Sequence, residues 1–163
     1  MSDRYIDFAN SSLGHRLVAA LGLPSPVRLE RWQAGRVQPV NGALLLGGSG
    51  ALATAASACL NKLTSDNYSA VEGAFGLPRW TAEHGPKLKA LIFDASALTS
   101  FEQLIELRHF FQPAFKGLGK CPRVVILARA PESLKDPVAA SVQRSLEGFS
   151  RSLGKEIRRG GNV

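Results

Sequence analysis

The sequence predicts an α/β fold with an open, mostly parallel sheet and helices on both faces. Three short apolar runs, at 43–46, 88–95 and 123–128, have the length and composition of strands that are buried on both faces. Segments with apolar residues at helical spacing follow these runs, at 50–63, 100–117 and 137–157. This alternation is typical of parallel sheets, because parallel neighbours need a crossover connection, which is usually a helix.

Length and composition describe one ordinary globular protein. The 163 residues are enough for a domain with a sizeable core, and 45% of them are hydrophobic and 20% charged. No apolar run approaches the length of a membrane span, and the N-terminus has no signal-peptide core, so we expect a cytoplasmic protein that does not contact the membrane. The two cysteines and three histidines are scattered, which predicts neither a disulfide nor a metal site.

The net charge of +7 raises the question of nucleic-acid binding. The charge is spread along the chain, and the sequence contains no zinc finger, helix-turn-helix signature or RNP-like aromatic motif. We therefore interpret the positive charge as a solvated basic surface and do not expect a nucleic-acid partner.

The first 41 residues read as an addition to the sheet domain. Residues 2–21 predict a helix that a new N-cap near Asn10–Ser12 would interrupt. Its apolar stripe consists of Leu13, Leu17, Val18 and Leu21. A proline-punctuated arm follows, with Leu29 and Trp32 as its large anchors. We assign residues 1–41 as a helical extension with an arm, suited to subunit contacts, and residues 42–163 as the sheet domain.

Four small residues connect the first predicted strand to its helix: Gly47, Gly48, Ser49 and Gly50. Glycines allow a sharp turn at positive φ, and a helix N-terminus is a natural phosphate site, as in dinucleotide-binding domains. The glycine fingerprint of those domains is damaged, however. With Gly48 as the first glycine, Leu52 and Thr54 occupy the later positions, where side chains would enter the pyrophosphate space or hold the helix off the strand. We expect a vestigial, structural turn; nucleotide or flavin binding at 47–50 is the alternative.

The middle of the chain supplies two acidic candidates for that site. A second strand is expected near 68–71, and Asp66 is the nearest residue that could hold a ribose hydroxyl. The strand at 88–95 contains Asp94 near its end. Because the carboxyl ends of parallel strands line one crevice, we expect Asp94 beside the glycine turn, as the fifth member of the degenerate cofactor site. The stretch 72–86 between them predicts a loop, anchored by its large apolar side chains: Phe75, Leu77 and Trp80.

The last two helices have clear apolar faces. The helix at 100–117 contains Pro113, which should kink or end it, and its expected core residues are Phe101, Leu104, Ile105, Phe111 and Phe115. The final helix carries a stripe of Val138, Val142, Leu146, Phe149, Leu153 and Ile157. Gly160 and Gly161 should terminate it, and the alternating pattern predicts a strand directly afterwards. We therefore expect an incomplete sheet, and the chain to be a fragment of a longer polypeptide.

The segment 148–160, Gly-Phe-Ser-Arg-Ser-Leu-Gly-Lys-Glu-Ile-Arg-Arg-Gly, resembles the helix of short-chain dehydrogenases that usually reads G-F-T-R-S-L-A-K-E. The order of elements over 42–163 agrees with that family. The family's catalytic tyrosine and lysine correspond to Ala139 and Gln143 here, and its serine finds no match in Ala128-Arg-Ala130. The resemblance thus implies a Rossmann-like domain with no catalytic residues of its own.

A second, more specific resemblance covers the whole chain. The opening helices, the turn at 44–50 and the helix at 146–156 are similar to the N-terminal, flavodoxin-like or degenerate Rossmann domain of high-molecular-weight 3-oxoacyl-(acyl-carrier-protein) reductases. This resemblance implies a parent enzyme that reduces a 3-ketoacyl thioester with NADPH or NADH in fatty-acid metabolism. The catalytic residues and the cofactor would belong to a downstream ketoreductase domain, and this segment would hold no cofactor.

The same resemblance implies the partners of the chain. These would be further copies in a homo-oligomer and the downstream ketoreductase domain. An acyl-carrier protein is a further candidate, because an acidic carrier could meet the basic residues of the last helix: Arg151, Lys155, Arg158 and Arg159.

Overall fold

The computed structural model describes residues 4–23, 27–31, 33–157 and 160–163. The chain divides into two compact units, Met1–Arg31 and Trp32–Val163. The predicted anchor Trp32 and the basic residues Arg158 and Arg159 lie outside the described residues.

The N-terminal unit contains two short helices, α1 (Arg4–Ala9) and α2 (Ser12–Ala20). The predicted break between them is confirmed. The Ser11 hydroxyl accepts a hydrogen bond from the Gly14 N–H at 3.1 Å, which satisfies one of the free amides at the start of α2.

The predicted apolar stripe of α2 is buried only at Val18, while Leu13, Leu17 and Leu21 are exposed. The unit is too small to cover both sides of a helix, so the periodicity correctly marks an apolar face but not a buried one. Gly22 ends α2 at a φ of 63°, and the Leu23 N–H donates to the Val18 carbonyl at 2.9 Å.

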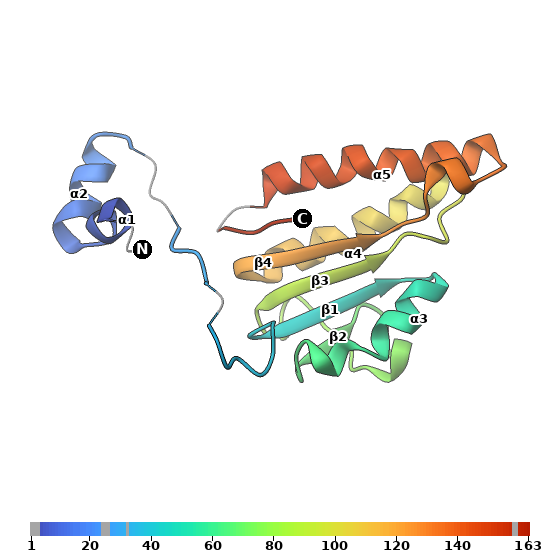
Figure 1. Cartoon of the computed structure of the whole chain (residues 1–163), viewed down its shortest axis with the longest axis horizontal. Helices are drawn as coiled ribbons and strands as arrows, with labels where there is room; N and C mark the ends of the chain where they lie inside the picture. Colours follow the sequence, from blue (N-terminus) through green and yellow to red (C-terminus); the bar gives the residue numbers. More distant parts are fainter. Residues whose placement is uncertain (1–3, 24–26, 32, 158–159) are drawn as a thin grey trace. The chain divides into compact units, whose positions relative to one another are not determined.

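The predicted α/β fold class is confirmed in the larger unit. Within the described residues, the strands β1 (Ala43–Gly48), β2 (Asn67–Ser69), β3 (Leu88–Asp94) and β4 (Leu118–Leu127) form one parallel sheet in the order β2-β1-β3-β4 (Figure 1). The chain moves outward from β1 in both directions, as in Rossmann and flavodoxin-like sheets. This arrangement places a topological switch point between β1 and β3, where such folds bind ligands.

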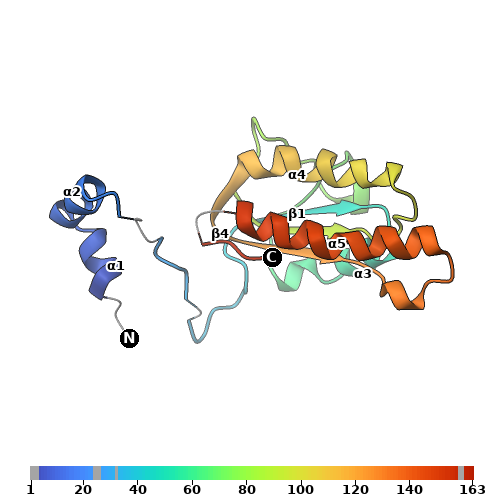
Figure 2. The same cartoon turned by 90° about the horizontal axis from the view of Figure 1, so that it is seen from above.

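Helices cover both faces of the sheet. The helix α3 (Ala51–Ser57) lies on one face, and α4 (Ile105–Gly117) and α5 (Pro137–Glu156) lie side by side on the other (Figures 1 and 2). Successive side chains of β1 alternate between two cores: Leu45 packs with residues of α4 and α5, whereas Leu44 and Leu46 pack with Ala53 and Leu60. This double burial explains the uninterrupted apolar run in the sequence.

The helix predicted at 50–63 is shorter than expected and turns a different face to the core. The α-helix ends at Ser57, and a 3₁₀ turn follows at Leu60–Lys62. Leu52 and Cys59, which fall at helical spacing in the sequence, are exposed, while Ala53 and Leu60 are buried. The segment is so rich in alanine that few large side chains distinguish one face from another.

The helix predicted at 100–117 begins with a 3₁₀ turn at Glu102–Leu104 before α4. Two of its expected core residues, Phe101 and Ile105, are 55% and 46% exposed, and Leu107 and Phe110 are buried instead. Pro113 does not end α4. Its ring lies on the exposed side of the helix, where water can satisfy the carbonyl left without an amide partner.

The region 72–86 is a loop as predicted, and it covers the outer edge of β2. The Ser69 N–H donates to the Pro78 carbonyl and the Trp80 N–H donates to the Ser69 carbonyl, each at 2.9 Å. The Trp80 ring is buried, and its indole N–H donates to the Pro86 carbonyl at 3.0 Å. A sheet edge protected in this way offers few free backbone groups to other chains.

The C-terminal part of the chain largely follows the prediction. Asp136 caps α5, with Pro137 in the first turn, and four of the six predicted stripe residues are buried: Val142, Leu146, Leu153 and Ile157. After α5 the chain returns to the sheet, where Asn162 forms a parallel bridge with Arg123. A single bridge residue, and no strand, therefore stands in the described residues where a strand was expected. None of the helices in the described ranges combines the length and apolar character needed to cross a membrane.

Candidate functional site

The candidate site is the crevice at the carboxyl ends of β1 and β3. Gly48 and Asp94 are direct register partners on these neighbouring strands. The turn from β1 to α3 therefore passes over the end of β3. The predicted position of Asp94 beside the glycine turn is confirmed.

The Asp94 side chain occupies the N-terminus of α3. It is fully buried, and its two oxygens accept separate backbone hydrogen bonds, Oδ2 from the Ala53 N–H at 2.6 Å and Oδ1 from the Ser96 N–H at 2.9 Å. The Ala53 amide lies in the first turn of α3 and also donates to the Gly50 carbonyl at 3.2 Å, so the carboxylate shares this donor with the backbone. The carboxylate is stabilised there by the same free amides and helix dipole that attract phosphate in nucleotide-binding folds.

Contacts within the chain explain the glycines of the turn. Gly48 has a φ of 95°, and a Cβ at this position would overlap the Asp94 backbone. A Cβ on Gly50 would overlap the Asp94 carboxylate, and one on Gly47 would overlap the ring of Phe110. The packing of the turn on β3 and α4 thus requires all three glycines, whereas Ser49 is exposed.

The side chains of Leu52 and Thr54 are exposed and do not separate α3 from the sheet. The helix packs through Ala53, whose side chain is completely buried. The expectation that residues 52 and 54 would hold the helix off the strand is therefore wrong, because both lie on the solvent side of α3.

Asp66 lies at the opposite end of the sheet from the glycine turn. It precedes β2, and its carbonyl accepts a hydrogen bond from the Leu44 N–H near the beginning of β1. A hydrogen bond to the Asp66 carboxylate raises the pKa of the Tyr68 phenol. The interpretation of Asp66 as a ribose-binding residue is wrong, since the ribose site of such folds is at the carboxyl end of the strands.

Gln143, at the position of the family's lysine, connects three segments of the domain. Its amide Nε2 donates to the carbonyls of Ala95 and Leu98, both at 2.8 Å, and its Oε1 accepts from the Arg129 N–H at 2.8 Å. The side chain is buried, and its donors and acceptor are engaged by backbone groups. Ala139, at the tyrosine position, is buried too. This role of Gln143 in joining three segments was not predicted from the sequence, although a glutamine next to Val142 on the apolar side of a helix could have indicated it.

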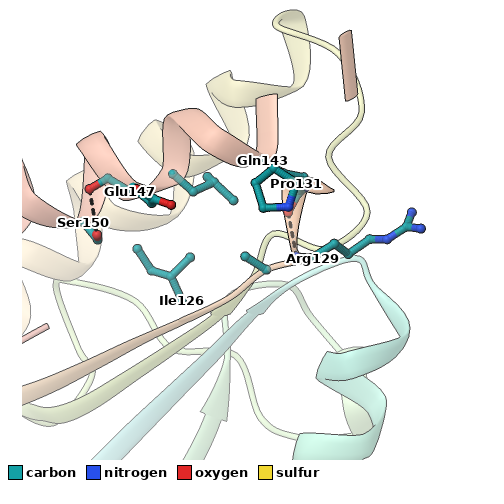
Figure 3. Close-up of a pocket in the computed structure, with 8 residues that line it drawn as sticks. Ile126, Arg129, Pro131, Gln143, Glu147 and Ser150 are labelled. Carbon is teal, nitrogen blue, oxygen red and sulfur yellow. Dashed lines mark hydrogen bonds between the residues drawn. The ribbon is translucent and has the colours of Figure 1, made fainter. Parts of the chain in front are cut away.

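A cavity of about 210 Å³ lies beside Gln143, between the end of β4 and α5 (Figure 3). It is lined by Ile126, Ala128, Arg129, Pro131, Gln143, Leu146, Glu147 and Ser150. The Arg129 side chain extends away from the cavity, and the Glu147 carboxylate accepts a hydrogen bond from Arg144 at 2.7 Å. The Ser150 hydroxyl donates to the Glu147 carbonyl at 2.9 Å. The lining therefore presents no nucleophile paired with a general base.

Ser133 is the first serine after β4, the strand that delivers the catalytic serine in the resembled family. It lies in a 3₁₀ turn at Pro131–Ser133, and its hydroxyl donates to the Ala130 carbonyl at 2.7 Å. The hydroxyl thus closes its own turn. Across the described parts of the chain, no group of three or more His, Cys, Asp or Glu residues could hold a metal ion.

The architecture and the crevice define the class of the protein: an open-sheet α/β domain of the Rossmann or flavodoxin-like type, whose switch point is filled by its own carboxylate. Comparison with models of known protein families gave no match, and comparison with curated proteins gave no significant match.

The first prediction concerns the glycine turn. Gly48→Ala should lower the free energy of unfolding by about 3 kcal/mol or more, because it combines a positive φ with overlap against rigid backbone. The matched control is Gly148→Ala in α5, where a Cβ meets open space and should stabilise the helix by about 1 kcal/mol. Urea denaturation of both variants measures the difference, and a neutral Gly48→Ala would contradict the close packing on Asp94.

The second prediction concerns Gln143. Gln143→Leu keeps much of the side-chain volume but leaves the amide of Arg129 and two carbonyls without their partner, which should cost about 3 kcal/mol of stability. Gln112→Leu on the exposed side of α4 is the matched control and should change stability by less than about 0.5 kcal/mol. Equal melting temperatures for the two variants would argue against the role of Gln143 in holding the three segments together.

Proposed function

We propose that this chain is a non-catalytic domain of a 3-oxoacyl-(acyl-carrier-protein) reductase and that it supports assembly of the enzyme. Reduction of the 3-ketoacyl thioester with NADPH or NADH is assigned to a downstream ketoreductase domain. The chain itself contributes a folded scaffold and surfaces for contact with other subunits.

One observation carries the non-catalytic part of the proposal: the polar groups that converge at the switch point bind one another. The Asp94 carboxylate holds the Ala53 amide at the start of α3, where a cofactor phosphate would need to bind. A second negative charge at this distance would be repelled in a poorly solvated site. Gln143 is engaged in the same way by three backbone groups.

The connection to a reductase is supported by the resemblance of the segment 148–156 and by the order of elements around it. In the fold, this segment belongs to α5, and its Phe149 and Leu153 pack in the core shared with β3 and α4. Two of the nine resembled residues, Phe149 and Leu153, thus hold the helix on the sheet. Such residues can be retained when catalysis is lost, because they serve the fold.

The assembly role is supported by the apolar surface of the N-terminal unit. The unit buries Ala9, Gly14 and Val18. It leaves six large apolar side chains exposed, four on the helices and two directly after α2: Tyr5, Phe8, Leu13, Leu17, Leu21 and Leu23. Concentrated exposed apolar residues are characteristic of protein–protein contact sites. We assign this surface to contacts between copies of the chain; the exposed basic residues Arg151 and Lys155 of α5 are the corresponding candidates for an acidic carrier protein.

The third prediction tests the absence of cofactor binding and chemistry. Titration of the folded chain with NADPH, NADH and FMN in a calorimeter should show no saturable binding in the micromolar range, because the Asp94 carboxylate occupies the anion position. The chain should also fail to oxidise NADPH in the presence of a 3-ketoacyl thioester. Saturable micromolar binding of any of the three would instead support the nucleotide- or flavin-binding alternative at Gly47–Gly50.

The fourth prediction tests assembly. The chain should be oligomeric by light scattering, and Leu17→Glu combined with Leu21→Glu should convert it to a monomer, since both side chains are exposed and apolar. Arg16→Glu on the same helix is the control for added negative charge and should leave the oligomer intact. A monomeric starting protein, or an oligomer that survives the double substitution, would contradict the assigned surface.

A further inference from the structure

The fold gathers basic residues that are scattered in the sequence. Between Glu106 and Glu132 the chain contains five lysines and arginines and no acidic residue. A second stretch without acidic residues, 84–93, contains Lys87 and Lys89. The first stretch passes through the start of β4 and the second through the start of β3, and these strands are parallel neighbours. Both stretches therefore bring charge to the same end of the domain, where the two strands begin and α4 ends (Figure 1).

Two contacts show how close these charges are. The Lys89 ammonium donates a hydrogen bond to the Lys120 carbonyl at 2.7 Å. The position of a Cβ on Gly119 lies 3.7 Å from the Cβ of Lys87. Lys87 and Lys120 therefore lie on adjacent backbone segments, although they are far apart in the sequence.

Four side chains at this end carry charge that the rest of the described chain does not neutralise. They are exposed and form no ion pair with another described residue, and we call them the basic end: Lys87, Lys116, Lys120 and Arg123. Lys116 lies in the last turn of α4, where the helix dipole favours a cation. The last turn of α5 adds Lys155 and Glu156, whose opposite charges offset each other. The basic end thus has an excess of positive charge at its surface.

The side chains of the basic end suit phosphate better than the surface of another protein. Protein–protein interfaces are enriched in aromatic residues, methionine and arginine and depleted in lysine. Three of the four residues here are lysines. A lysine ammonium is a compact point charge, and lysine and arginine are the usual partners of nucleic-acid phosphates. The aromatic residues of the two stretches pack in the core: Phe93, Phe110, Phe111 and Phe115.

The same aromatic residues distinguish a duplex from a single strand. Proteins bind single strands largely by stacking the bases on aromatic side chains. With its aromatic side chains in the core, the basic end offers charge without such a platform. A duplex keeps its bases stacked inside and presents closely spaced phosphates outside, so charge alone is sufficient to bind it.

We propose that the basic end binds the phosphate backbone of double-stranded nucleic acid without reading its sequence. This departs from the expectation drawn from the sequence, which rested on the spread of the charges along the chain. The proposal is independent of the proposed function, because it uses neither the N-terminal unit nor the basic residues of α5.

The fifth prediction uses a fluorescent DNA duplex of mixed sequence and about 20 base pairs, whose anisotropy reports binding. The dissociation constant should lie between about 1 and 100 μM at about 50 mM salt. Its logarithm should change with the logarithm of the salt concentration with a slope of magnitude about 2 to 4, since each neutralised phosphate contributes about 0.9. Lys87→Gln combined with Lys120→Gln should lower this magnitude by about 2 and weaken binding at least about tenfold at the lower salt concentration.

The matched control removes the same charge from the other end of the sheet. Arg129→Gln combined with Lys135→Gln changes two exposed residues that follow β4, and it should alter the affinity by less than about twofold. A second pair in the basic end, Lys116→Gln with Arg123→Gln, should reproduce the loss seen with the first pair. This pair guards against an effect of the first pair on folding, which the urea midpoint of each variant also measures.

Several results would overturn the proposal. One is the absence of binding to the duplex at low salt, and another is an equal loss of affinity with the control pair, which would reflect net charge alone. Tighter binding of the single strand, of vesicles that contain anionic phospholipid, or of an acidic carrier protein would assign the basic end to that partner and contradict the choice of a duplex.

Discussion

The contact between the Asp94 carboxylate and the first turn of α3 is the interaction on which the rest of the domain depends. It brings the end of β3 against the turn that follows β1, so that Gly48 and Gly50 have no room for side chains. The other carboxylate oxygen orders the loop after β3 through Ser96. Gln143 then binds that loop from α5 and connects it to the end of β4. The buried Asp94 side chain thus connects the ends of β1 and β3, and Gln143 connects the loop after β3 with the segment after β4.

The interactions that stabilise this contact are the same as those that stabilise a bound phosphate. Free amides and the positive end of the helix dipole favour any anion in that position, and hydrogen bonds to a charged acceptor contribute about 1.5–3 kcal/mol. In a nucleotide-binding domain the amides await a ligand, whereas here the anion is part of the chain and binds as the protein folds. A glycine-rich turn before a helix therefore indicates that an anion or a backbone segment lies close to it. The surrounding residues show whether that anion is a ligand or a side chain of the same protein.

The sequence predicted well those features that depend on local patterns or on general rules of topology. The apolar runs of β1, β3 and β4 gave the sheet, and the rule for parallel strands gave the position of Asp94. It failed where the pattern carried little information, as in the alanine-rich α3, whose buried face depends on Ala53. The position of Gln143 on the apolar side of a helix could indicate a buried polar contact, but not its carbonyl partners, because Ala95 and Leu98 are 48 and 45 residues away.

The chain's own groups fill the crevice between β1 and β3. The backbone groups that still need partners therefore lie at the two outer edges of the sheet. Every backbone N–H and C=O of a sheet needs a partner, and the chain supplies one at β2 through the loop at Pro78–Trp80. At the outer edge of β4, the described residues supply one bridging residue, Asn162. A small cavity lies nearby, between β4 and α5. At the switch point, the Asp94 carboxylate accepts the Ala53 and Ser96 amides, so these two donors are engaged by the chain itself.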